Sequence, residues 1–139
     1  MARPLRLKLA ALCHEAGHLH SRPAKRAYMP KLIVLYPTPI DLETFERRYR
    51  LEHVPLVQGK IPGLTKFVAA QVLGTPAGPA PYQRVAELYF DSVESLQSAM
   101  ASAEGQAAVA HAMEISTGGA PIVLIAEDDA FESELASAI

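Results

Sequence analysis

Phe45, Tyr49 and His53 recur every four residues in a segment whose other positions are largely charged. Residues four apart share one face of a helix, so these three rings form a stripe that would face the protein interior. The imidazole of His53 can titrate near neutral pH and could take a proton from a carbon next to a carbonyl group. The Tyr49 hydroxyl could orient the ligand. His53 and Tyr49 are therefore our candidate catalytic residues.

Each of these side chains also has a structural interpretation. A histidine at a helix end can hydrogen-bond a main-chain carbonyl and is favoured by the negative end of the helix dipole. A buried tyrosine can simply fill the core, and Tyr36, at the end of an expected strand, could either close a pocket mouth or pack against its neighbours. The candidate ligand-binding residues are Tyr36, Phe45, Tyr49 and His53.

Other polar residues give weaker indications of chemistry. We expect Arg48 and Arg50 to be ordinary solvated charges and His111 to be a surface residue on a late helix. The chain has no glycine-rich phosphate loop and no nucleophile elbow. Hydrolase and nucleotide chemistry therefore lack their usual sequence support, and we expect no cofactor.

The segment from His14 to His18 matches the HExxH pattern, in which two histidines bind zinc and Glu15 activates water. Gly17 weakens the helix that must present both histidines, and no convincing third ligand follows. His20 adds an imidazole, so adventitious metal binding is more plausible than a zinc peptidase. We expect no functional metal site.

The composition is that of one folded domain. In 139 residues, 50% are hydrophobic and 20% are charged, which is enough apolar material for a core. No apolar run approaches the roughly 20 residues of a membrane-spanning helix, so we expect no membrane association. The single cysteine, Cys13, cannot form an intramolecular disulfide, and a cytoplasmic location is the expectation.

Charge is distributed unevenly along the chain. Residues 1–28 carry six basic residues and one acidic residue, whereas the remainder has a balance of −7. We interpret residues 1–28 as a basic N-terminal extension outside the fold, and residues 29–139 as the domain, with an acidic C-terminal tail. The acidic domain argues against nucleic-acid binding.

Four strands are expected where apolar and β-branched residues concentrate or alternate, at residues 31–36, 64–73, 84–90 and 122–126. The proline- and glycine-rich residues 74–81 predict a loop. An Asp41 cap predicts a helix to about His53, and Pro55 followed by Ile61-Pro62-Gly63 should end the helical region.

Leu42 should join the apolar stripe of this first helix, and the pairs Glu43–Arg47 and Glu46–Arg50 should form its solvated face. Asp91 and Glu94 resemble a capping box that begins a second helix, followed by a further turn or two around residues 106–115.

This order predicts an α+β, ferredoxin-like β-α-β-β-α-β fold, with a four-stranded antiparallel sheet and both helices on one face. The opposite sheet face would be apolar and uncovered. A second copy of the chain is the simplest cover, so we expect a homodimer through this open sheet face.

The pattern of residues in the first helix and before the second strand resembles that of the EthD family of dimeric α/β-barrel proteins. The resemblance covers about residues 30–127, and its most specific part is F-x3-Y-x3-H-x-P in the first helix, followed by Ile61-Pro62-Gly63-Leu64. It implies a dimeric barrel with a small pocket between sheet and helices in each subunit. The family takes its name from a bacterial ether-degradation gene cluster that includes a monooxygenase.

Two main functions remain open from the sequence, beside the less favoured zinc peptidase built on His14, Glu15 and His18. The first is a cofactor-independent protein that binds, and isomerises or rearranges, a small apolar organic compound in catabolism. The second is a non-catalytic accessory or carrier for an oxygenase pathway. A ligand-sized cavity at His53 with a second polar group in reach would favour the first.

Overall fold

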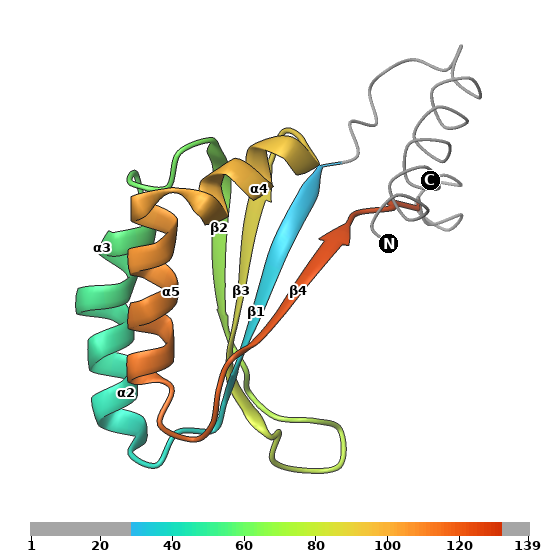
Figure 1. Cartoon of the computed structure of the whole chain (residues 1–139). Coiled ribbons are helices and arrows are strands. Elements are labelled where there is room, and N and C mark those ends of the chain that lie inside the picture. Colours follow the sequence, from blue (N-terminus) through green and yellow to red (C-terminus); the bar gives the residue numbers. More distant parts are fainter. Residues whose placement is uncertain (1–28, 132–139) are drawn as a thin grey trace, which may run out of the picture.

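The computed structural model describes residues 29–131, which form a four-stranded antiparallel sheet with helices on one face (Figure 1). The strands are β1 (Pro30–Pro37), β2 (Leu64–Gln71), β3 (Tyr82–Phe90) and β4 (Ile122–Glu127), in the spatial order β2-β3-β1-β4. The helical segments are α2 (Leu42–Arg48), a π-helical turn η1 (Tyr49–His53), α3 (Val54–Val57), α4 (Val93–Ala101) and α5 (Ala103–Ile115). The predicted ferredoxin-like α+β arrangement is confirmed.

The first helical segment begins as expected but ends later. Asp41 is the N-cap, and its carboxylate accepts a hydrogen bond from the main-chain N–H of Thr44. The chain then continues through the π turn and past Pro55 to Val57. Pro55 does not end the helix because it lies in the first turn of α3, where a missing N–H is tolerated.

The second helical region differs from the prediction in both its cap and its length. Ser92, rather than Asp91, caps α4 by accepting a hydrogen bond from the N–H of Ser95. Ser102 then caps α5, which has 13 residues instead of a turn or two. This length carries α5 back beside the first helical segment, and the two pack together (Figure 1).

Alternation along the strands divides the sheet into a helix-covered face and an open face. Leu32, Val34 and Tyr36 of β1 are buried beneath the helices, as are Ala86 and Leu88 of β3. The covered face meets the stripe of the first helix, where Phe45, Tyr49 and His53 are 2%, 0% and 5% exposed. The prediction that this stripe faces the sheet is confirmed.

Two predictions about the same helix are wrong. Leu42 is 51% exposed, because no element among residues 29–131 covers this side of the first turn. The expected Glu46–Arg50 pair is present at 3.5 Å, but Glu46 is not part of a solvated face: its carboxylate points to the sheet and accepts a hydrogen bond from Arg84 Nε at 2.9 Å. Arg84 draws it inward because a buried guanidinium requires a charged partner.

The open face carries apolar residues from β1 and β4. Ile33 and Leu35 of β1 pair in register with Leu124 and Ile122 of β4, so these four side chains share it. Ile122 is 40% exposed and Leu124 is 47% exposed. Within residues 29–131, no helix is both long and apolar enough to span a bilayer.

Candidate functional site

A cavity of about 130 Å³ lies between the covered face of the sheet and helix α5. Its walls come from all four strands, from η1, α3, α4 and α5, and from the loops before β2 and β4. Met113 and Val123 line it and are 59% and 49% exposed, so the cavity opens to solvent between α5 and β4. Among its lining residues, Tyr36 and His53 are the ones whose side chains carry oxygen or nitrogen.

Tyr36 and His53 reach the cavity from opposite layers and meet there. Tyr36 occupies the buried side of β1, and His53 ends the π turn above it. The Tyr36 hydroxyl and His53 Nε2 lie 3.1 Å apart, and the two side chains are almost fully buried. The arrangement places one proton donor and one proton acceptor in an otherwise apolar cavity.

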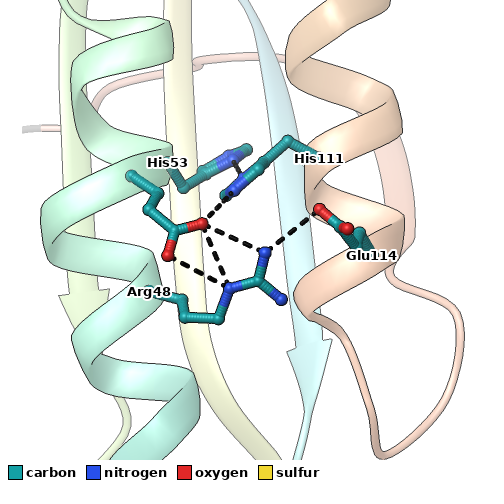
Figure 2. A network of polar contacts seen from close by, with 5 residues as sticks. Arg48, His53, His111 and Glu114 are labelled. Carbon is teal, nitrogen blue, oxygen red and sulfur yellow. Dashed lines mark hydrogen bonds and ion pairs between the residues drawn. The ribbon is translucent and has the colours of Figure 1, made fainter.

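His111 of α5 lies against His53 (Figure 2). The rings of His53 and His111 stack with centroids 5.2 Å apart, and their Nδ1 atoms are separated by 3.0 Å. The His111 side chain is 13% exposed, so the prediction of a surface residue is wrong. It is covered because α5 is long enough to place this residue against the π turn.

Carboxylate and guanidinium groups complete the network at the surface (Figure 2). His111 Nε2 lies 3.1 Å from Glu52 Oε1, and Arg48 Nε donates to both oxygens of Glu52. Arg48 also pairs with Glu114 at 3.1 Å. The expectation that Arg48 is an ordinary solvated charge is wrong, since it joins two elements, whereas Arg50 is 64% exposed as expected.

Burial sets the protonation states at the cavity. Burial first, and then the neighbouring His111, lower the pKa of His53 from 6.5 to about 4. Burial raises the pKa of Tyr36 well above its usual value. At neutral pH the cavity therefore presents an uncharged imidazole and an un-ionised phenol.

The lowered pKa of His53 predicts a pH dependence of stability. The unfolded chain binds a proton on this residue below about pH 6.5, whereas the folded protein resists it down to about pH 4. The His53 contribution to stability is thus fully present above this window and is lost as the pH falls through it. Urea unfolding at several pH values should show a weaker loss across this window in His53→Gln than in the wild type. Parallel profiles would contradict the shifted pKa.

Phe45 and Tyr49 lie on the stripe with His53 but do not line the cavity. The Tyr49 ring packs between those of Phe45 and His53, with centroid distances of 5.7 and 5.5 Å. The Arg84 guanidinium lies over this ring at 5.0 Å, and burial raises the pKa of Tyr49 to about 12. Its hydroxyl is buried without a hydrogen-bond partner among residues 29–131. The structure thus brings Tyr36, not Tyr49, to His53 Nε2.

Sequence reasoning missed Glu52 and His111. One signal was available: Arg48 and Glu52 have the four-residue spacing of a helical ion pair, next to the candidate histidine. Nothing local indicates the partner of His53 that lies 58 residues further along the chain. His14, Glu15, His18 and His20 lie outside the described residues.

Comparisons with known proteins agree with the fold. The EthD domain model matches residues 37–114. A protein of 11.0 kDa from the thcB–thcC intergenic region of Rhodococcus erythropolis is 33% identical over 100 residues, which are 72% of this chain and 96% of that protein.

Solved structures give the same result. An EthD family protein from Bacillus halodurans C-125 is 38% identical, with a TM-score of 0.69 over 73% of this chain and 99% of that one. A dimeric ferredoxin-like protein from Jannaschia sp. CCS1 is 18% identical, with a TM-score of 0.59 over 72% of this chain and 99% of that one. From the matched domain and these identities, we conclude that the chain belongs to the EthD family.

Proposed function

We propose that the protein binds a small, largely apolar carbonyl compound in the cavity and that His53 takes a proton from it. The observation that carries this proposal is the pairing of Tyr36 and His53, the two side chains with oxygen or nitrogen in the apolar lining. A polar pair inside an apolar pocket fixes the orientation of a ligand and supplies a site for proton transfer.

The size of the cavity suggests the size of the ligand. An apolar cavity of roughly 150 Å³ can hold benzene. The cavity of about 130 Å³ is close to this, and its opening between α5 and β4 leaves room for a substituent. The ligand that fits best is a single ring or a branched chain of similar volume.

The two polar groups suit abstraction of a proton next to a carbonyl group. The Tyr36 hydroxyl can turn from His53 to the ligand carbonyl and donate its hydrogen there. His53 Nε2 then has a free lone pair for the adjacent C–H. Both groups start uncharged, so the site binds a neutral ligand without burying a charge. An isomerisation follows when the proton returns to a different carbon.

Phe45 and Tyr49 have a supporting role in this proposal. Their stacked rings form the packing behind His53 and hold its imidazole against Tyr36. The catalytic role expected for Tyr49 passes to Tyr36, because Tyr49 does not line the cavity.

The second candidate is a carrier that holds the same compound without changing it. The apolar lining alone would serve that function. The buried Tyr36–His53 pair favours catalysis, because a carrier of an apolar compound does not need an uncharged base beside its ligand. Family membership is the basis for placing either function in catabolism.

We also propose that two copies pair through the open sheet face. Ile33, Leu35, Ile122 and Leu124 give this face a continuous apolar strip across β1 and β4. Lys31 on the same face is already paired, with Glu87 at 3.0 Å and Asp128 at 2.8 Å. A second copy of the chain would cover the strip. Because the charge of Lys31 is already paired, it would not oppose this association.

Hydrogen exchange into cyclohexanone tests the proposed chemistry. In deuterium oxide, the wild type should speed the loss of the α-proton NMR signals, since the cavity that His53 lines opens to solvent between α5 and β4. His53→Gln should reduce the catalysed rate by at least about a hundredfold, because glutamine cannot act as the base.

The same samples separate the two candidates. Cyclohexanone that perturbs the amide signals of cavity residues without faster exchange would contradict catalysis and support a carrier. No perturbation of the cavity signals at any concentration would contradict both. Glu43→Gln is the matched control, because Glu43 is exposed on the same helical segment and does not reach the cavity.

A further inference from the structure

We propose that Glu52 and His111 are positioning residues that fix the hydrogen of His53 on Nδ1, so that its Nε2 lone pair faces Tyr36 and the cavity. This inference rests on the proposed function, and it assigns roles to two residues outside the cavity. It also specifies the ligand as a neutral carbonyl compound with a removable α-hydrogen, because this tautomer makes His53 a base and leaves Tyr36 as the donor.

At the surface, the contact between Glu52 and His111 allows one direction of hydrogen bonding. Arg48, and after it His111, lower the pKa of Glu52, which is therefore a carboxylate and can only accept. His111 Nε2, 3.1 Å away, must carry the hydrogen. A neutral His111 then has its lone pair on Nδ1.

The lone pair on His111 Nδ1 then determines which atom of His53 carries the hydrogen. His53 Nδ1 faces His111 Nδ1 at 3.0 Å, so His53 must donate its hydrogen there. His53 Nε2 is left with a lone pair, and the Tyr36 hydroxyl at 3.1 Å donates to it. Every member of the chain from Tyr36 to Glu52 then has a satisfied hydrogen bond. The opposite tautomer of His53 would place two lone pairs against each other at the Nδ1 contact.

The network also receives the proton that the reaction produces. When the C–H bond breaks, its electron pair enters the forming enolate, whose oxygen accepts a hydrogen bond from Tyr36, and the proton binds His53 Nε2. His53 Nδ1–H can then pass to His111 Nδ1, and the Glu52 carboxylate, which accepts the His111 Nε2–H hydrogen bond, stabilises the imidazolium that forms. The positive charge thus moves from a buried ring toward a carboxylate with a side chain that is 47% exposed. Reversal of these steps restores the starting state.

The charged and titratable groups around the network come from three elements. Tyr36 lies on β1, Arg48 and Glu52 lie on the first helical segment, and His111 and Glu114 lie on α5. Arg48 bonds both Glu52 and Glu114, so it holds the carboxylate in place between the helices. This clamp explains why a partly exposed carboxylate can orient a buried ring.

The variant His111→Phe tests the inference most sharply, because it keeps a ring for stacking on His53 but removes the acceptor. The readout is the long-range proton–nitrogen NMR spectrum of the histidine rings at neutral pH, with His53 assigned by comparison with His53→Gln. In the wild type, His53 should carry its hydrogen on Nδ1. In His111→Phe, the form with hydrogen on Nε2 should become substantially populated.

Kinetics with cyclohexanone should separate positioning from binding. The rate of α-hydrogen exchange should fall at least about tenfold in His111→Phe, while the affinity for cyclohexanone stays within about twofold. Glu52→Leu, a change at an exposed position that leaves His111 in place, should shift the tautomer and the rate in the same direction. Glu43→Leu is the control and should change neither.

The outcomes distinguish this inference from the proposed function. A wild-type His53 with its hydrogen on Nε2 would overturn the inference even if exchange is catalysed. Unchanged tautomer and rate in both His111→Phe and Glu52→Leu would also overturn it and leave these residues a purely structural role. A wild type with the expected tautomer but no catalysed exchange would contradict the proposed function instead.

Discussion

Glu46→Ala should lower the free energy of unfolding by about 3 kcal/mol, because it leaves the buried Arg84 guanidinium without its partner. Arg84 is 6% exposed and donates from Nε to Glu46 at 2.9 Å. The guanidinium also lies over the Tyr49 ring, so its displacement would disturb the packing behind His53. Urea denaturation measures the loss directly.

Two further variants show whether the unpaired charge is the cause. Glu43→Ala removes an exposed carboxylate from the same helix and should cost less than about 0.5 kcal/mol. The double variant Glu46→Ala/Arg84→Met should recover much of the loss, since neither charge remains buried. A Glu46→Ala protein as stable as Glu43→Ala would show that the pair does not support the helix.

Ile33→Glu should convert the proposed dimer to monomers. Ile33 lies near the middle of β1 and shares the open face with Leu124, its register partner on β4. A twofold interface would contain the substituted residue twice, so two unpaired carboxylates would be buried. A penalty of about 3 kcal/mol for each raises the dissociation constant by at least about a thousandfold.

Analytical ultracentrifugation over a range of concentrations measures this effect. Lys60→Glu is the control: it introduces a carboxylate at an exposed position outside the sheet and should leave the dimer intact. A wild type that sediments as a 15.0 kDa monomer at all concentrations would contradict the proposed homodimer. An Ile33→Glu dimer as stable as the wild type would place the interface on another surface.

The sheet and the order of its elements could be predicted because they follow from local patterns. In β3, Ala86, Leu88 and Phe90 alternate with Val85 and Glu87, and this alternation specifies which side chains face the helices. Helix continuation past Pro55 was harder to predict, since a proline is compatible with the first turn of a helix as well as with a helix end.

Only part of the candidate site could be predicted from local sequence patterns. Four-residue spacing correctly oriented Phe45, Tyr49 and His53 toward the sheet, but it does not specify which of them meets a cavity. Tyr36 reaches His53 because strand β1 passes beneath the π turn, and that crossing is a property of the tertiary structure. Spacing also placed Leu42 on the stripe, although burial there requires a neighbour that the described part of the chain does not supply.

The partners of His53 away from the cavity could not be predicted from the pattern. His111 and Glu114 lie on α5, more than 50 residues from the groups that they contact. Their contacts depend on the length of α5 and on how it packs beside the first helical segment. From charge patterning alone, His111 and Glu114 would be predicted to lie exposed to solvent. In the structure, α5 packs beside the first helical segment and brings them into one polar network.

A crystal structure of the protein grown with cyclohexanone would show where the ligand binds and how it is oriented. We expect the ring between β1 and α5, with its oxygen within hydrogen-bond distance of the Tyr36 hydroxyl and an α-carbon facing His53 Nε2. A ligand bound outside this cavity, or inside it with its oxygen turned away from Tyr36 and His53 toward Met113, would contradict the proposed function.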